Sequence, residues 1–402
     1  MRASCVTNNV EQVATAEPPL YLDFAASTPP AEEVVEAMLP WLRQAHANPH
    51  AQHWHGRRAG EAVDAAREAV AHLIGAEPES IVFTSGATEA NNLALKGLLS
   101  TVGPRRRLWL ADTEHKSLRE PARYLASQGV RVDALPVSIT GRVEPTDLLA
   151  ALANSRVTPG LVAISQGNNE FGTLQPLPTL GRIAADHGHL VHVDASQSAG
   201  RVPVAVADLC CDLLCLSSHK IYGPGGIGAL YIAPKHQSAL TPQMHGGGQE
   251  GGARSGTVAP FLAVGFGTAA KLAQRRLAYD AFYLQQLART FIGTLANTGA
   301  NFQWIGDPEE RLPGHVSLRF PGVAADDLLA VLGPMLSAST GSACVAGELR
   351  ASAVLRALGL TEQAASEVIR FTFGRSNHPD DAQRIAVAVA AGATRVAERN
   401  RW

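Results

Sequence analysis

The sequence lacks the features that mark membrane proteins and nucleic-acid-binding proteins. No apolar run approaches the ~20 residues that a membrane span requires. The formal net charge is only -2, from 34 basic and 36 acidic residues among 402, and aromatic residues make up 5%. The one basic run, 105–107, precedes an apolar segment and is typical of a solvated strand entry. We therefore expect no membrane and no nucleic-acid partner.

Cysteine is also scarce. Five unevenly spaced cysteines argue against a disulfide framework and favour a reducing compartment, so we expect a cytoplasmic protein. Cys210, Cys211 and Cys215 lie in a strand-like apolar segment without a C-x-x-C pair, which favours buried thiols over a metal site. Cys344 instead lies among glycines and small residues, and composition alone leaves a reactive and a structural role equally open. Cys5 belongs to residues 1–19, which lack a secretory signal and are expected to form a poorly ordered extension.

Short apolar runs alternate with helical patterns along the first two thirds of the chain. Such runs, bounded by Gly, Pro, Asp or Ser, are typical of buried strands in a mostly parallel sheet. They lie at 80–86, 107–112, 130–137, 160–166, 189–195, 212–218 and 228–234. Helical patterns between them, such as 59–75 and 89–100, indicate the α/β class.

The pattern changes after Pro260. A long helical stretch, 263–295, precedes strand and helix patterns that are typical of a smaller α+β domain. We predict a large domain at 20–262, with a mostly parallel seven-stranded sheet, and a small C-terminal domain at 263–402 that carries Cys344. The N-terminal helix, 31–44, is expected to pack on the small domain.

Polar residues close several of the predicted strands, and ligands in such sheets bind at the carboxyl ends of strands. One rim would therefore gather hydroxyls, amides, two histidines, a carboxylate and an amine. Pyridoxal phosphate matches this set, because its aldehyde needs a lysine, its pyridine nitrogen a carboxylate, and its phosphate N–H groups and hydroxyls. A helix start after 84–88 would supply N–H groups for the phosphate. The remaining candidates are Lys220 for the Schiff base, Asp194, His115, and Ser217 and His219 for the phosphate.

A nucleotide-binding loop is a weaker interpretation of the glycine-rich segment 223–228. Its sequence, GPGGIG, is neither G-x-x-x-x-G-K-[ST] nor a G-x-G-x-x-G that opens a helix. A plain nucleotide-binding α/β protein would also show no absorbance from a lysine-bound cofactor.

Nine segments carry a more specific signal when they are taken together. They run in order as YLDFAASTPP, IVFTSGATEANNLALKG, TEHKSL, NNEFGTLQP, HVDASQSAG, SSHKIYGPGGIGALYI, HGGGQEGGARSGT, TGSACVAG and VLRALGL. The set resembles the cysteine desulfurases of the NifS/IscS type, within the class V aminotransferase-like, fold-type I pyridoxal phosphate enzymes. The resemblance extends from about Tyr21 to the C-terminal helix.

The resemblance implies a role for individual residues. Lys220 would bind the cofactor covalently, Asp194 would pair with the pyridine nitrogen, and Gln197 would bond the ring hydroxyl. His115 would stack on the ring and accept a proton from the substrate thiol. Asn169 and Arg370 would hold the carboxylate of L-cysteine, with Asn169 also beside the cofactor. The phosphate would be held by Ala87, Thr88, Ser217, His219 and, from the second subunit of a homodimer, Thr257.

Cys344 then acquires a chemical role. The resemblance implies that its thiolate attacks the sulfur of bound cysteine, takes it as a persulfide for a sulfur-acceptor protein of unknown identity, and leaves alanine. Several segments depart from the family pattern. Near the predicted site, the departures are Val345-Ala346-Gly347 after the nucleophile and Gln166-Gly167 before the paired asparagines. Elsewhere they are Ala47, Gly251 and a C-terminus without the tail that docks an iron–sulfur scaffold. A further departure is the set of histidines at 46, 50, 53 and 55, for which we favour a substrate loop over a metal site.

Two alternatives stay open at this point. The first is a related pyridoxal phosphate enzyme, such as a carbon–sulfur β-lyase, a selenocysteine lyase or an aminotransferase-like catalyst, in which Cys344 is incidental. The second is a non-catalytic sulfur-delivery module, which the presence of Lys220, Asp194, His115 and Arg370 argues against.

Overall fold

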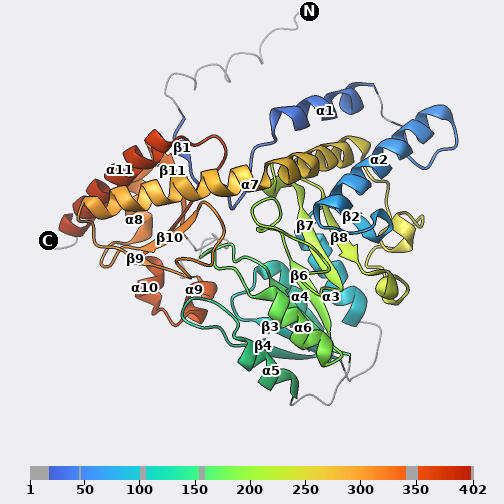
Figure 1. The fold of residues 1–402 in the computed structure, drawn as a ribbon, viewed down its shortest axis with the longest axis horizontal. Coiled ribbons are helices and arrows are strands. Elements are labelled where there is room, and N and C mark those ends of the chain that lie inside the picture. The colour runs from blue at the N-terminus through green and yellow to red at the C-terminus, as the bar shows by residue number, and fades with distance from the viewer. Residues whose placement is uncertain (1–17, 45–46, 100–105, 154–158, 341–351, 400–402) are drawn as a thin grey trace, which may run out of the picture.

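The computed structural model describes residues 18–44, 47–99, 106–153, 159–340 and 352–399. Its largest element is a seven-stranded sheet in the order β2-β8-β7-β6-β5-β3-β4 (Figure 1). Only β8 runs antiparallel to its neighbours, so the predicted mostly parallel sheet is confirmed. All seven predicted runs form strands: β2 (Ile81–Thr84), β3 (Arg107–Ala111), β4 (Arg131–Leu135), β5 (Leu161–Ser165), β6 (Leu190–Asp194), β7 (Leu213–Ser217) and β8 (Gly228–Ile232).

This sheet is the middle layer of three. Successive side chains of a strand point to opposite faces, and in β3 Trp109 packs in one core while Leu108 and Leu110 pack in the other. One face is covered by α3 (Ala87–Leu99) and α4 (Lys116–Ser127). The other is covered by α2 (Trp54–Leu73), α5 (Pro145–Ala153), α6 (Leu177–Asp186) and the first half of α7 (Pro260–Asn297). Burial on both faces explains why these strands are continuous apolar runs.

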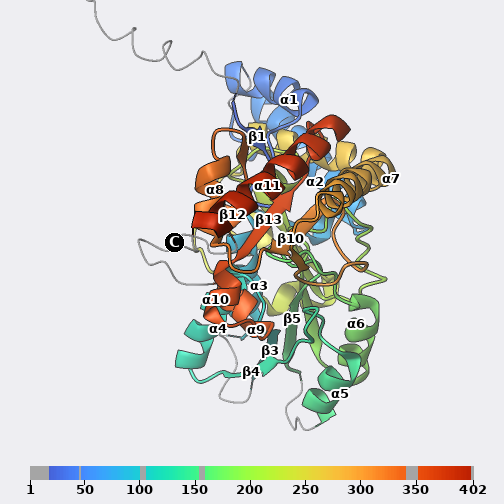
Figure 2. The same cartoon turned by 90° about the vertical axis from the view of Figure 1, so that its left-hand side faces the viewer.

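A smaller antiparallel sheet, in the order β12-β13-β10-β9, forms the second unit. The helices α7 and α11 lie side by side along it (Figure 2). Phe266 of α7 is buried in the large core and Phe291 in the small one, so this helix joins the two units. The remaining elements are β9 (Gln303–Trp304), β10 (His315–Arg319), α8 (Ala325–Leu332), β11 (Leu336–Ser337), β12 (Ser339–Thr340), α9 (Ala353–Ala357), α10 (Glu362–Ser366), β13 (Val368–Thr372) and α11 (Pro379–Arg399).

The start of the chain is placed differently from our expectation. Helix α1 (Glu32–Arg43) packs along α7, and its Val34 is buried in the core of the large sheet rather than on the small unit. Gly265 of α7 makes room for this contact, because a Cβ there would lie 2.6 Å from the sulfur of Met38. The strand β1 (Leu20–Tyr21) instead pairs with β11 of the small unit. The domain limits at 20–262 and 263–402 stay a prediction.

In the described ranges no helix is both long and apolar enough to span a membrane. Within the described residues, four short 3₁₀ segments complete the secondary structure, and one of them, Ser218–Lys220, directly follows β7. The other three are Pro78–Ser80, Pro234–Ala239 and Glu250–Gly252.

Candidate active site

A cavity of about 1110 Å³ lies at the carboxyl ends of β5, β6 and β7. Ten of the predicted site residues line it: Ala87, Thr88, His115, Asn169, Asp194, Gln197, Ser217, His219, Lys220 and Arg370. Thr257 is not part of this lining, and Cys344 lies outside the described residues. Cys344 lies in a segment that is bounded by two described residues, Thr340 and Ser352. Both of these residues line the cavity.

Lys220 is held at the cavity by the backbone of the turn that follows β1. Its Nζ donates hydrogen bonds to the carbonyl oxygens of Ala25, at 2.6 Å, and Ala26, at 2.8 Å. Burial, and then the charges of Arg370 and Arg201, lower the pKa of Lys220 to about 8. At pH 7 about a tenth of this amine is therefore uncharged, which is the state that attacks an aldehyde.

The glycine-rich loop after Lys220 allows close backbone packing at the cavity. A Cβ on Gly223 would lie 2.1 Å from the Ser218 hydroxyl, and Gly226 has a φ of +87°, which side chains rarely adopt. Gly226 also lines the cavity.

Asp194 ends β6 as a buried carboxylate with three hydrogen-bond donors. Its Oδ1 accepts from the backbone N–H of Ser196 at 2.9 Å and from the Ser196 hydroxyl at 2.5 Å, and its Oδ2 accepts from Asn91 Nδ2 at 2.8 Å. Burial raises the pKa of Asp194, but the hydrogen bonds from Ser196 and Asn91 outweigh it and hold the pKa below its usual value. The group is therefore an anion, as a protonated ring nitrogen requires.

The donor set at this cavity fits pyridoxal phosphate. Gln197 donates through Nε2 to the Ala25 carbonyl at 2.9 Å, while its buried Oε1 has no hydrogen-bond partner among the described residues. A buried acceptor of this kind suits a ligand that carries a hydroxyl group. Helix α3 begins at Ala87, and the first N–H groups of a helix have no partner within it, which suits an anionic group.

His115 is the N-cap residue of α4. Its Nδ1 accepts a hydrogen bond from the backbone N–H of Ser117 at 3.1 Å and lies 2.9 Å from the Ser117 hydroxyl. Desolvation by the surrounding protein lowers the pKa of His115; Asp194 opposes this shift, and Lys220 adds to it. The imidazole is therefore neutral at neutral pH, with its ring exposed to the cavity.

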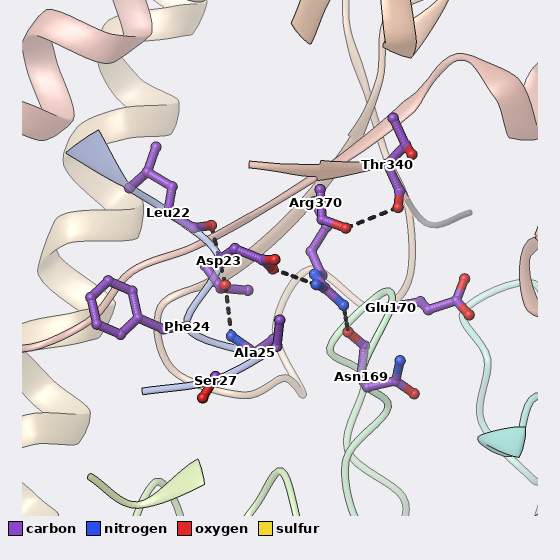
Figure 3. A network of polar contacts seen from close by, with 12 residues as sticks. Leu22, Asp23, Phe24, Ala25, Ser27, Asn169, Glu170, Thr340 and Arg370 are labelled. Carbon is purple, nitrogen blue, oxygen red and sulfur yellow. Dashed lines mark hydrogen bonds and ion pairs between the residues drawn. The ribbon is translucent and has the colours of Figure 1, made fainter. Parts of the chain in front are cut away.

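Arg370 projects from β13 toward a second group of polar partners (Figure 3). Its Nη2 pairs with Asp23 Oδ1 at 2.5 Å and its Nη1 donates to the Asn169 carbonyl at 2.8 Å. These two contacts orient the guanidinium at the cavity. The predicted pair of Asn169 and Arg370 is therefore brought together, although it is the backbone of Asn169 that makes the bond.

Sequence reasoning missed several residues that hold the site. Asp23 lies in one of the recognised segments, but nothing in its local pattern distinguishes it from a turn residue. Asn91 could have been found, because it lies on the buried face of α3 beside Ala90, Leu93 and Ala94, and a buried amide needs polar partners. The other missed residues are Ser117, Ser165, Glu170 and Ser352, which line the cavity, and His192, whose Nε2 lies 2.8 Å from Asn91 Oδ1. Glu114 and Ser196, which close predicted strands, also line the cavity.

The histidine-rich segment takes a structural role at His53. Its Nδ1 accepts from the backbone N–H of Gly56 at 3.1 Å and so caps α2. Among the described residues no group of three potential metal ligands is gathered, and His46 lies outside them.

Glu114 leads to a prediction about stability and pH. It is buried and accepts from the backbone N–H of Ser165 at 2.9 Å and from the Ser165 hydroxyl. Burial raises its pKa from 4.5 to about 7, so the folded state holds a proton that the unfolded state releases. The stability that this proton provides is present in full below pH 4.5 and is lost as the pH rises to about 7.

We therefore expect Glu114→Gln to gain stability relative to the parent as the pH rises from 5 to 8, by up to roughly 3 kcal/mol. Urea unfolding of both proteins at the two pH values measures this difference. The exposed Glu36→Gln on α1 is the matched control and should follow the parent. A Glu114→Gln protein whose stability relative to the parent is the same at both pH values would contradict the prediction.

Comparison with known proteins places these features in a family. The model of the family "Aminotransferase class-V" matches residues 20–385. The cysteine desulfurase IscS of Rickettsia bellii is 39% identical over 89% of this chain and 87% of its own. A solved NifS-like protein superposes with a TM-score of 0.85 at 32% identity, covering 93% of this chain and 98% of its own.

A second solved structure is described as SspA in complex with cysteine. It superposes with a TM-score of 0.78 at 35% identity, over 88% of this chain and 98% of its own. The segments that suggested the family, the sheet order, and the lysine and carboxylate at one cavity agree with these matches. The chain therefore belongs to the class V aminotransferase family and, within it, to the cysteine desulfurases of the NifS/IscS type.

Proposed function

We propose that the protein is a pyridoxal phosphate-dependent cysteine desulfurase that converts L-cysteine to L-alanine and takes the sulfur on Cys344 as a persulfide. The observation that carries this function is the convergence of Lys220, Asp194 and Arg370 on one cavity in a chain of this family. A lysine with a lowered pKa, a buried anion and a positioned guanidinium are the groups that amino-acid chemistry on this cofactor requires.

Each cofactor-binding residue has a distinct task. Asp194 would hold the pyridine nitrogen protonated, Gln197 would bond the ring hydroxyl, and Lys220 would attach the aldehyde. When bound, the cofactor supplies an electron sink that weakens bonds at the α- and β-carbons of an amino acid. The phosphate would be held by the start of α3, at Ala87 and Thr88, with Ser217 and His219, and by Thr257 of a second copy in a homodimer.

Substrate binding follows from the orientation of Arg370. Its guanidinium binds the carboxylate of L-cysteine, and Asn169 contributes beside it. Asp23 holds the guanidinium from the other side, so that little side-chain entropy is lost when the substrate binds. A related protein has been solved with cysteine bound, which is consistent with this substrate.

Sulfur transfer is the task of Cys344. The thiolate attacks the substrate sulfur, so that an S–S bond forms as the C–S bond breaks, and the carbon skeleton gains a proton and leaves as alanine. A free thiol has a pKa near ~8.5, so a modest lowering suffices to form the thiolate. The persulfide then passes to an acceptor protein, for which iron–sulfur assembly is one candidate pathway. The cysteine pattern supports a reducing compartment such as the cytoplasm.

Product analysis tests the function against its main alternative. The purified holoenzyme is given L-cysteine and a thiol reductant, and alanine, sulfide, pyruvate and ammonia are quantified. We expect alanine and sulfide in equal amounts. Pyruvate and ammonia in place of alanine would establish a β-lyase and reject the desulfurase, and absence of turnover with cofactor bound would favour the delivery module.

A further inference from the structure

A buried amide links the pyridine-binding carboxylate to the histidine at the cavity wall. Asn91 Nδ2 donates to Asp194 Oδ2 at 2.8 Å and to the Ser117 hydroxyl at 2.9 Å, and Asn91 Oδ1 lies 2.8 Å from His192 Nε2. A carboxylate only accepts, so the amide nitrogen must face Asp194. The amide oxygen therefore faces His192, whose Nε2 must carry a hydrogen.

The state of His192 agrees with this orientation. Burial lowers its pKa to about 4, so the ring is neutral and holds one hydrogen. The amide of Asn91 is therefore held in one orientation from both sides.

The hydrogen bonds run in the same direction from Asn91 through Ser117 to His115. The Ser117 oxygen receives the N–H of Asn91, which leaves the hydroxyl hydrogen free to be donated to His115 Nδ1 at 2.9 Å. The backbone N–H of Ser117 also points at Nδ1, at 3.1 Å, and a backbone N–H can only donate. Because two donors face Nδ1 of His115, this nitrogen must be bare, that is, it must carry no hydrogen.

We propose that Asn91 and Ser117 are positioning residues that hold neutral His115 with its hydrogen on Nε2, so that the ring presents a hydrogen-bond donor to the cavity rather than a base. The tautomer of His115 is inferred from the hydrogen bonds alone. Only its consequence for the substrate rests on the proposed function. It changes our expectation that His115 accepts the proton of the substrate thiol, because the nitrogen that faces the cavity already carries a hydrogen.

The consequence concerns the form of the substrate. A donor at Nε2 can hydrogen-bond the sulfur of bound cysteine, so the thiol keeps its proton until the Cys344 thiolate attacks, the outer sulfur of the persulfide carries that proton, and no bond is made or broken at His115. The charged groups that face His115 are Asp194, Lys220 and Lys116.

Nitrogen NMR of the ¹⁵N-histidine-labelled holoenzyme tests the inference directly. The shifts of the two ring nitrogens separate a bare from a protonated nitrogen, and a His115→Gln variant assigns the signals. We expect a bare Nδ1 and a protonated Nε2 at neutral pH. A protonated Nδ1 with a bare Nε2, or a mixture of the two forms in the parent, would overturn the proposal whatever products the enzyme makes.

Two variants test the positioning roles. Ser117→Ala removes the hydroxyl donor and Asn91→Ser shortens the amide, and each should shift the ring toward a mixture of the two forms and lower kcat/KM for cysteine about tenfold. Ser127→Ala, the same change at an exposed position of the same helix, should leave both readouts unchanged. If the ring nitrogens of folded Ser117→Ala match those of the parent, the hydroxyl does not position His115.

Discussion

Replacing Lys220 by alanine is expected to abolish the visible absorbance of the lysine-bound cofactor and to lower turnover by at least about a thousandfold. Burial lowers the pKa of this amine to about 8, and the amine is presented by two backbone carbonyls rather than by a carboxylate. Absorbance scans and alanine formation by the purified variant measure both losses.

A second substitution separates chemistry from structure at this position. Lys220→Arg keeps a cation that can donate to Ala25 and Ala26, but a guanidinium stays protonated and cannot attack an aldehyde. We expect it to lose turnover as fully as Lys220→Ala while keeping the parent's thermal stability more closely. Lys271→Ala, at an exposed position of α7, is the matched control and should behave as the parent. Retained absorbance in Lys220→Arg would show that Lys220 does not attach the cofactor.

The large sheet could be predicted from the sequence because local pattern is sufficient for it. Each strand is buried on both faces, so its residues form one apolar run that ends where the chain turns polar. The polar residues at those ends then meet at the same edge, which is why the strand pattern alone predicts that Asp194 and Lys220 share one site. The glycines after Lys220 mark the loop for the same local reason.

Contacts between distant segments could not be predicted in this way. Asp23 reaches Arg370 across 347 positions of sequence, and nothing near either residue identifies the other. The apolar face of α1 shows that this helix packs, but not whether it meets the large core or the small one. Asn91 is an intermediate case, because its burial on α3 is readable while its partners Asp194 and Ser117 come from other elements.

Replacing Cys344 by alanine is expected to stop the formation of alanine and sulfide, with a loss of about a thousandfold or more, while the cofactor absorbance stays as in the parent. The residue lies outside the described ranges, so the expectation rests on chemistry and on its neighbours. Thr340 and Ser352 line the same cavity as Lys220, and Ser352 is anchored there by a hydrogen bond of 2.5 Å between its Oγ and Glu170 Oε2.

The matched control is another free cysteine. Cys210→Ala removes a partly exposed thiol that lies away from the cavity lining, so it should leave turnover unchanged. Mass spectrometry after a single addition of cysteine should find one extra sulfur on the parent and on Cys210→Ala but none on Cys344→Ala. Alanine formation by Cys344→Ala at the parent's rate would mean that the sulfur leaves without a protein thiol. In that case Arg370 and Lys220 would retain their tasks, and Cys344 would be a bystander.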